Sequence, residues 1–250
     1  MQSQYLVVTG GSRGIGAAIA RCAARTGFDV VLTYRSRPEA AAEVVRDVEA
    51  EGRRAEALPF DAGTDAAADL FTRIDAAMPG GRLAALVNNA GITGPIARIE
   101  AVDEAMLMQV MRTNVVAPMA CMREAVLRMS ARHGGAGGSI VNVSSRAAQI
   151  GGGGEWVHYA ASKGAVDSIT MGAARELGDE SIRVNAVAPG LIETEIHAAA
   201  GAPDRLERLV AGVPMGRAGT AEEVAEAVLW LISDAAAYVS GAVLPISGGR

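Results

Sequence analysis

Short apolar runs alternate with amphipathic stretches along the whole chain. Seven runs predict strands, and most are continuously apolar, which is typical of strands buried on both faces. The strands are expected at residues 5–9, 29–34, 54–60, 83–88, 139–143, 183–188 and 242–246, and helical patterns at residues 14–25, 38–51, 64–78, 103–133, 159–177 and 221–233. This alternation predicts an α/β fold with a doubly wound parallel sheet in a single domain, residues 1–250.

Several helix starts carry their own signals. Pro38 suits a first turn, Asp103 is a good N-cap, and Thr220 followed by Glu223 predicts a capping box. Residues 195–216 interrupt the strand–helix pattern late in the chain, and we expect them to form a mobile substrate lid.

Composition narrows the class of protein. Half of the 250 residues are apolar, 20% are charged and the net charge is −5, which argues against nucleic-acid binding. The sequence has no apolar run of membrane-spanning length and no Cys/His cluster for a metal, so we expect a cytoplasmic protein without a metal site. Cys22 and Cys121 lie in apolar stretches and are expected to be buried thiols.

The first predicted strand runs into a glycine-rich turn at the start of a helix. Such a turn lets the backbone approach a pyrophosphate, and the helix N-terminus supplies free N–H groups. A turn of this kind is a weak signal alone, but its place at the first strand–helix junction strengthens it. The candidate cofactor residues are Gly10, Ser12, Arg13, Gly14, Ile15 and Gly16.

The end of the second strand indicates which nucleotide binds. An acidic residue there would bind the ribose 2′-hydroxyl of NAD, but this chain has Tyr34, Arg35 and Ser36. Arginine can bind a 2′-phosphate, and Arg13 can approach the same group. We therefore predict NADP(H) as the cofactor; the alternative is that Arg35 and Arg37 are solvated loop charges.

Tyr159 and Lys163 lie four residues apart, hence on one face of a predicted helix. Lys163 is the single lysine among 23 basic residues. A neighbouring ammonium favours the phenolate, so we expect Lys163 to lower the pKa of Tyr159 and suit it to acid–base work. Such a pair is frequent on exposed helices, and it gains weight here from the cofactor turn.

The order and spacing of these motifs, through to Gly248 and Gly249, resemble the short-chain dehydrogenase/reductase family. The resemblance lies with its NADP-preferring branch, similar to 3-oxoacyl-carrier-protein reductases and glucose dehydrogenases. It implies a Rossmann-type sheet of about seven strands with helices on both faces, and a homotetramer. It also implies that Tyr159 and Lys163 contact the cofactor, together with Asp61, Ala62, Asn88, Ala90, Gly91, Pro189, Gly190, Ile192 and Thr194.

The resemblance further implies roles for two other residues. Asn114 would hold a water connected to Lys163, and Ser145 would hydrogen-bond the substrate oxygen. The glycines at 151–154 lengthen the interval from Ser145 to Tyr159, which leaves Ser144 as the alternative. His158 is expected either to touch substrate or to face solvent from a loop.

The predicted function is an NADP(H)-dependent oxidoreductase that interconverts a carbonyl compound and a secondary alcohol, with a small-molecule substrate. An alternative within enzymes is a 3-oxoacyl-carrier-protein reductase, for which Arg132 and Arg175 could meet an acidic carrier. An alternative outside enzymes is a non-catalytic nucleotide-binding regulator, although such proteins tend to lose the Tyr or the Lys, and this chain has both.

Overall fold

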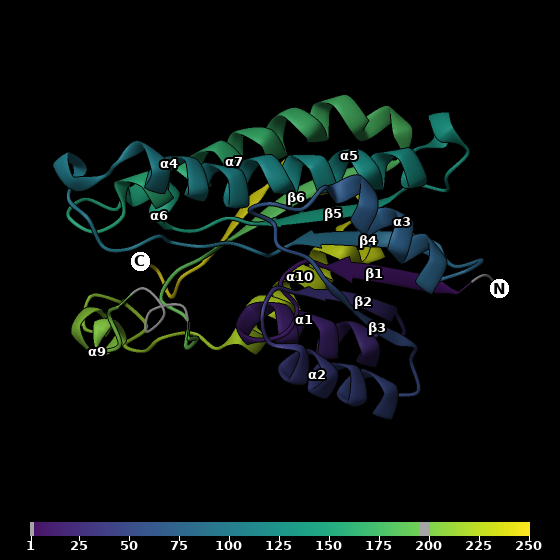
Figure 1. The fold of residues 1–250 in the computed structure, drawn as a ribbon, viewed down its shortest axis with the longest axis horizontal. Helices are drawn as coiled ribbons and strands as arrows, with labels where there is room; N and C mark the ends of the chain where they lie inside the picture. The colour runs from purple at the N-terminus through teal and green to yellow at the C-terminus, as the bar shows by residue number, and fades with distance from the viewer. Residues whose placement is uncertain (1–2, 196–200) are drawn as a thin grey trace.

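A seven-stranded parallel sheet forms the centre of the computed structural model, which describes residues 3–195 and 201–250 (Figure 1). The strands are β1 (Gln4–Val8), β2 (Asp29–Tyr34), β3 (Ala55–Pro59), β4 (Arg82–Asn88), β5 (Gly138–Val143), β6 (Ile182–Pro189) and β7 (Val243–Ile246). Their order is β3-β2-β1-β4-β5-β6-β7, and every neighbouring pair is parallel. The predicted doubly wound sheet is confirmed, with strand ends within one residue of those expected.

Helices cover both faces of the sheet (Figure 1). Successive β1 residues alternate between the two faces, so Leu6 and Val8 join one core while Tyr5 and Val7 join the other. One face carries α1 (Gly14–Arg25), α2 (Pro38–Ala50) and α10 (Ala221–Ile232). The other face carries α3 (Ala67–Ala77), α5 (Ala117–Met129) and α7 (Val157–Leu177). The remaining α-helices of the described chain are α4 (Glu104–Met111), α6 (Ala147–Ile150) and α9 (Arg205–Val210).

The predicted helix starts are confirmed. Pro38 lies in the first turn of α2. The Asp103 carboxylate accepts a hydrogen bond of 2.7 Å from the Met106 N–H and caps α4. Thr220 and Glu223 form a reciprocal capping box at the start of α10. These contacts satisfy N–H groups that a helix terminus otherwise leaves unpaired.

The single helix expected at residues 103–133 was wrong. The segment divides into α4, a π-helical turn at Arg112–Val116 and α5, and a short 3₁₀ turn follows at Ala131–His133. In the π turn the Ala117 N–H bonds to the Arg112 carbonyl, five residues back. Pro118 has no N–H to give to the Asn114 carbonyl, so a regular α-helical ladder cannot continue through this point.

The expected lid, residues 195–216, is described in part. Residues 196–200 of it lie outside the described residues. The rest includes α9, whose Arg205 packs over the Trp156 ring, with 4.4 Å between the guanidinium carbon and the ring centroid. Closure of this segment over substrate stays a prediction.

The expected burial of the two cysteines is confirmed, and both are free thiols. Burial raises the pKa of Cys121 to about 12. Within the described ranges, no helix is both long and apolar enough to cross a membrane, and no three His, Cys, Asp or Glu side chains are grouped to hold a metal ion.

Candidate active site

Two adjoining pockets lie along the carboxyl edge of the sheet, where the strand order turns back between β1 and β4. Ligands bind at such a switch point in open α/β sheets. One pocket is lined by the glycine-rich turn and the end of β2, and the other by Ser145, Tyr159 and Lys163. The two pockets share four lining residues, Ile15, Asn89, Gly91 and Thr194, so they form one continuous crevice.

The glycine-rich turn has the form expected for a phosphate site. Gly10 and Gly14 have positive φ angles of 66° and 51°, which favour glycine. A side chain on Gly10 would meet the Ala90 backbone at 3.0 Å. Arg13 precedes α1 in extended conformation without a side-chain cap, so the first-turn N–H groups are free of a capping side chain. Ser12, Gly14 and Ile15 line the pocket beside them.

Gly16 was expected to contact the cofactor, and that contact stays a prediction. It is buried and does not line either pocket described here. A Cβ on Gly16 would lie 2.3 Å from the Gly10 carbonyl oxygen and 2.5 Å from Asn89 Nδ2. Its lack of a side chain therefore lets α1 pack beneath the turn.

Arginines gather around the end of β2. Tyr34, Arg35 and Ser36 line the pocket as expected, and so does Arg13. Arg37, for which solvation in the loop was the alternative to phosphate binding, also lines it. Arg13 and Arg37 both donate to the Glu195 carboxylate, at 2.9 and 2.7 Å. Arg35 is exposed and forms no ion pair with the residues that the structure describes.

The next two strand ends complete this pocket. Asp61 and Ala62 line it, and the Asp61 carboxylate accepts from the Gly63 N–H at 2.8 Å. Ala90 and Gly91 line it at the end of β4.

Asn88 was wrongly expected in the pocket. Its side-chain amide is buried and donates to Asn142 Oδ1 at 2.9 Å. The neighbouring Asn89 faces the pocket instead, and its Nδ2 donates to the Thr9 and Gly10 carbonyls, both at 3.0 Å. Successive strand-end side chains point to opposite faces, and the sequence did not show which face holds the pocket.

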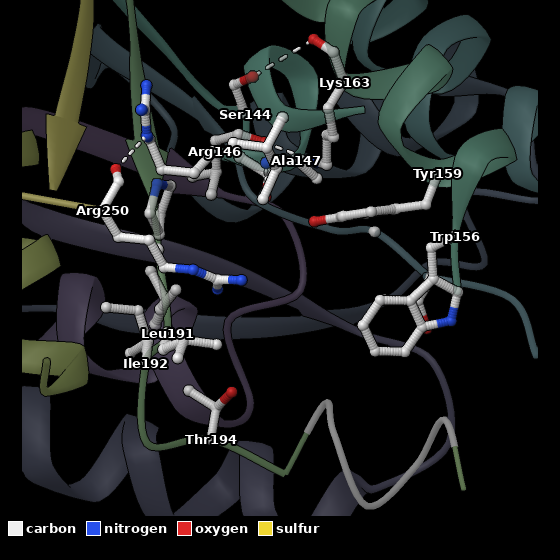
Figure 2. A pocket seen from close by; sticks show the side chains of 18 of the residues that line it. Ser144, Arg146, Ala147, Trp156, Tyr159, Lys163, Leu191, Ile192, Thr194 and Arg250 are labelled. Carbon is white, nitrogen blue, oxygen red and sulfur yellow. Dashed lines mark hydrogen bonds between the residues drawn. The ribbon is translucent and has the colours of Figure 1, made fainter. Parts of the chain in front are cut away.

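Tyr159 and Lys163 lie one turn apart on α7 and both line the second pocket (Figure 2). The Lys163 ammonium is buried, lies 5.7 Å from the centroid of the Tyr159 ring and donates to the Val143 carbonyl at 2.7 Å. Burial lowers the pKa of Lys163 to about 8.

The expected lowering of the Tyr159 pKa was wrong for this structure. Burial raises the pKa of Tyr159, and the opposing effects of the Ser145 hydrogen bond and the Arg205 charge are smaller. The Lys163 ammonium is directed to the Val143 carbonyl and lies over the face of the phenol ring. The phenol therefore holds its proton.

The two candidate serines point in different directions. The Ser145 hydroxyl accepts from the Ala147 N–H at 3.1 Å, and Ser145 lines the second pocket together with Tyr159. The Ser144 hydroxyl is buried and bonds to the Asp167 carboxylate and the Lys163 carbonyl. Ser145, and not Ser144, is therefore placed to meet a ligand beside Tyr159.

Asn114 lies in the π turn and is buried. Its side chain accepts from the Ile92 N–H at 2.9 Å and donates to the Ile92 carbonyl at 2.8 Å and to Ser162 Oγ at 3.0 Å. A Cβ on Gly91 would lie 3.2 Å from Asn114 Oδ1 and 3.5 Å from Lys163 Nζ. Asn114 therefore ties the loop after β4 to α7 beside the lysine.

The segment after β6 forms the opposite wall of the second pocket. Pro189, Gly190, Ile192 and Thr194 line it, as expected for a cofactor-clasping segment. Gly190 allows this segment to pass close to Ser247, because a Cβ there would lie 2.8 Å from the Ser247 Cβ.

Trp156 and Arg250 also line the second pocket. Trp156 meets Tyr159 edge to face, with ring centroids 6.4 Å apart. Arg250, which follows β7, also lines the pocket, and no motif pointed to it. Neither expectation for His158 was correct. It is buried, and its Nε2 lies 2.9 Å from the Thr93 carbonyl oxygen.

The chain is similar to known proteins along nearly its whole length. Residues 10–250 match the family model described as "Enoyl-(Acyl carrier protein) reductase". The chain is 45% identical over 245 residues to the "uncharacterized oxidoreductase YgfF" of Escherichia coli (strain K12), covering 98% of each chain. It is 36% identical over 250 residues to the 3-oxoacyl-[acyl-carrier-protein] reductase FabG of Pseudomonas aeruginosa, covering 100% of this chain and 98% of that protein.

A solved structure agrees with these sequence relatives. The fold is similar to that of a short-chain dehydrogenase from Burkholderia cenocepacia J2315 in complex with NADP, with a TM-score of 0.89 and 35% identity. The similarity covers 99% of this chain and 98% of that one.

Proposed function

Because this chain belongs to the short-chain dehydrogenase/reductase family of oxidoreductases, we propose that it interconverts a carbonyl compound and a secondary alcohol with NADP(H). The observation that carries the proposal is that Ser145, Tyr159 and Lys163 together line the pocket that adjoins the nucleotide crevice. A proton donor and a polar partner thus lie together where a reacting oxygen could be bound.

The first pocket supports a nicotinamide dinucleotide. The turn from Gly10 to Gly14 and the uncapped start of α1 would hold the pyrophosphate, and Asp61 with Ala62 would border the adenine. The guanidinium groups of Arg13, Arg35 and Arg37 would bind a 2′-phosphate. When bound, the nicotinamide would supply or accept the hydride.

The protein's own groups would manage the proton and the developing charge. In the reduction direction Tyr159 gives its proton to the carbonyl oxygen, and its raised pKa keeps that proton in place beforehand. Ser145 donates a hydrogen bond to the same oxygen as negative charge develops. Lys163 would hold the nicotinamide ribose, and Asn114 would hold the water that returns a proton to Tyr159.

Substitution of the phenol tests this assignment. We expect Tyr159→Phe to lower kcat on carbonyl substrates by about 100-fold or more, the usual contribution of a general acid. NADPH binding, measured by fluorescence titration, should stay close to that of the wild type. Turnover close to that of the wild type would contradict the assignment, and NADPH binding by a wild type that turns over no carbonyl would favour the regulator alternative.

Comparison of the two nucleotides tests the cofactor separately. We expect a higher kcat/KM with NADPH than with NADH, because β2 ends in Tyr34 and not in an acidic residue, and three arginines line the pocket there. An equal or higher value with NADH would contradict the NADP(H) proposal.

A 3-oxoacyl-carrier-protein reductase is the second candidate, supported by the 36% identity to FabG. Of the two arginines considered for an acidic carrier, Arg132 is paired with Asp179 at 3.1 Å and with Glu180 at 3.0 Å, whereas Arg175 is exposed. Turnover of a 3-oxoacyl carrier protein in clear preference to the same acyl group on a small thiol would support this candidate.

A further inference from the structure

Three arginines surround the pocket beside Tyr159. Arg146 follows β5, Arg205 lies in α9 and Arg250 follows β7, so they reach the pocket from three separate parts of the chain. Figure 2 shows the Arg250 guanidinium extended into the open space between Tyr159 and the segment that holds Leu191 and Ile192.

Two of these arginines have partners. Arg205 is largely buried, and its guanidinium pairs with the Glu155 carboxylate at 3.0 and 2.9 Å while it stacks on Trp156. Arg146 donates to the main-chain oxygen of Arg250 at 2.8 Å (Figure 2). It also donates to the Gln149 side chain at 3.2 Å.

The Arg250 guanidinium is different. Among the residues that the structure describes, no side chain or carbonyl accepts a hydrogen bond from it, and no carboxylate pairs with it. Burial lowers the pKa of Arg250, the neighbouring charges of Arg205 and Arg146 lower it further, and the Glu155 carboxylate acts in the opposite direction. A half-buried cation beside two others is costly unless an anion compensates it.

The partners of the three arginines differ. Arg205 engages the Glu155 carboxylate and Arg146 engages the main-chain oxygen of Arg250, so among the described residues only the Arg250 guanidinium of these three is without an acceptor. The apolar side chains of Trp156, Ile150 and Leu191 also line the pocket. The pocket thus offers one free planar fork of N–H donors together with apolar side chains, within the site that holds the proposed proton donor.

We propose that the substrate is an oxo acid or hydroxy acid, whose carboxylate is bound by Arg250 while its carbonyl or hydroxyl carbon lies at Tyr159. This proposal rests on the proposed function and names its substrate class. A guanidinium can bind a carboxylate through two parallel hydrogen bonds. The apolar side chains of the pocket would contact the hydrocarbon chain between the carboxylate and the reacting carbon. A phosphate-bearing ketone is the competing anion, and the test includes it.

The test compares charged and neutral forms of the same ketones with NADPH. The probes are 4-oxopentanoate, 5-oxohexanoate and 6-oxoheptanoate, each beside its methyl ester, together with dihydroxyacetone phosphate. We expect at least one acid to exceed its ester in kcat/KM by about tenfold or more, the usual contribution of charge-assisted hydrogen bonds. Equal values for every acid and ester, or a clear preference for the phosphate, would overturn the carboxylate assignment.

Arg250→Gln locates the effect. Because the Arg250 guanidinium holds no other described residue, the variant should fold, and its acid-to-ester ratio of kcat/KM should fall about tenfold. Arg46→Gln is the matched control, since Arg46 is exposed on α2 and does not line the pocket. An unchanged ratio in Arg250→Gln would overturn the role of Arg250.

A binding measurement separates this proposal from the proposed function. With NADPH present, calorimetry should detect pentanoate but not pentanamide binding to the wild type, and neither should bind to Arg250→Gln. If no ketone were reduced, the proposed function would fail, and the pentanoate measurement would still decide whether the pocket binds carboxylates. Equal binding of pentanoate and pentanamide would overturn the carboxylate proposal and leave the proposed function standing.

Discussion

The Arg13 guanidinium donates to the Glu195 carboxylate at 2.9 Å across the mouth of the nucleotide pocket. The same carboxylate oxygen accepts from Arg37 at 2.7 Å. Hydrogen bonds from Arg13 and Arg37 lower the pKa of Glu195. Both guanidinium groups are therefore engaged by a carboxylate of the chain itself, at the place where we propose that a 2′-phosphate binds.

Removal of this carboxylate should favour the phosphate. We expect Glu195→Gln to tighten NADPH binding a few-fold in a fluorescence titration, since an exposed ion pair is weak but must be broken before the phosphate binds. NADH binding should change less. Glu193→Gln is the control, because Glu193 is exposed and does not line the pocket. Unchanged or weaker NADPH binding in Glu195→Gln would show that Glu195 does not compete with the phosphate.

The buried lysine should make stability depend on pH. Burial lowers the pKa of Lys163 to about 8, whereas an unfolded lysine titrates near about 10.4. Between these values the unfolded chain binds a proton that the folded chain has released. The stability due to this group therefore rises with pH across the window, by about 1 kcal/mol per pH unit.

Urea unfolding without nucleotide measures this effect against Lys163→Met. The comparison is needed because the raised pKa of Cys121 acts in the opposite direction in both proteins. The wild type should gain stability relative to Lys163→Met between about pH 8 and about pH 10. Parallel pH profiles of unfolding free energy for the two proteins would contradict the lowered pKa of Lys163.

Asn114 should matter for stability as well as for turnover. Asn114→Ala removes both partners of the Ile92 main chain and the bond to Ser162, so we expect a loss of about 2 kcal/mol in the free energy of unfolding. The kcat should also fall, because the loop after β4 is released beside Lys163. Val116→Ala in the same π turn is exposed and should cost less than about 0.5 kcal/mol. Equal losses in the two variants would contradict the positioning role.

We propose that the protein forms a homotetramer, and light scattering can measure its mass. Met108, Met119, Leu127 and Met171 are exposed apolar side chains on α4, α5 and α7. Exposed apolar surface on these helices favours association. We expect the wild type to have the mass of four chains and Met119→Glu to have a lower mass. A monomeric mass for the wild type would rule the proposal out.

The sheet could be predicted from the sequence because its strands are buried on both faces. Leu6 to Val8, for example, form a continuous apolar run, and turns rich in glycine separate strand from helix. Tyr159 and Lys163 could be paired because a helix places residues i and i+4 on one face, whatever the rest of the fold does.

Features that depend on tertiary packing could not be predicted in the same way. The sequence did not show which strand-end asparagine faces the pocket, and Asn89 does so in place of Asn88. Arg250 enters the site only because β7 pairs with β6 at the sheet edge. The break at Asn114 did leave a signal, since Pro118 cannot complete an α-helical bond to that carbonyl.

The Lys163 ammonium, held on the Val143 carbonyl, is a suitable site-specific probe for spectroscopy. Since the chain has one lysine, isotopic labelling of that amino acid places a single side-chain amine signal in the proposed active site. The chemical shift of that signal would follow nucleotide and substrate binding without assignment of any other resonance. Amine-selective acylation, read at the Lys163 side chain and distinguished from the α-amino group, would likewise report the opening of this one crevice.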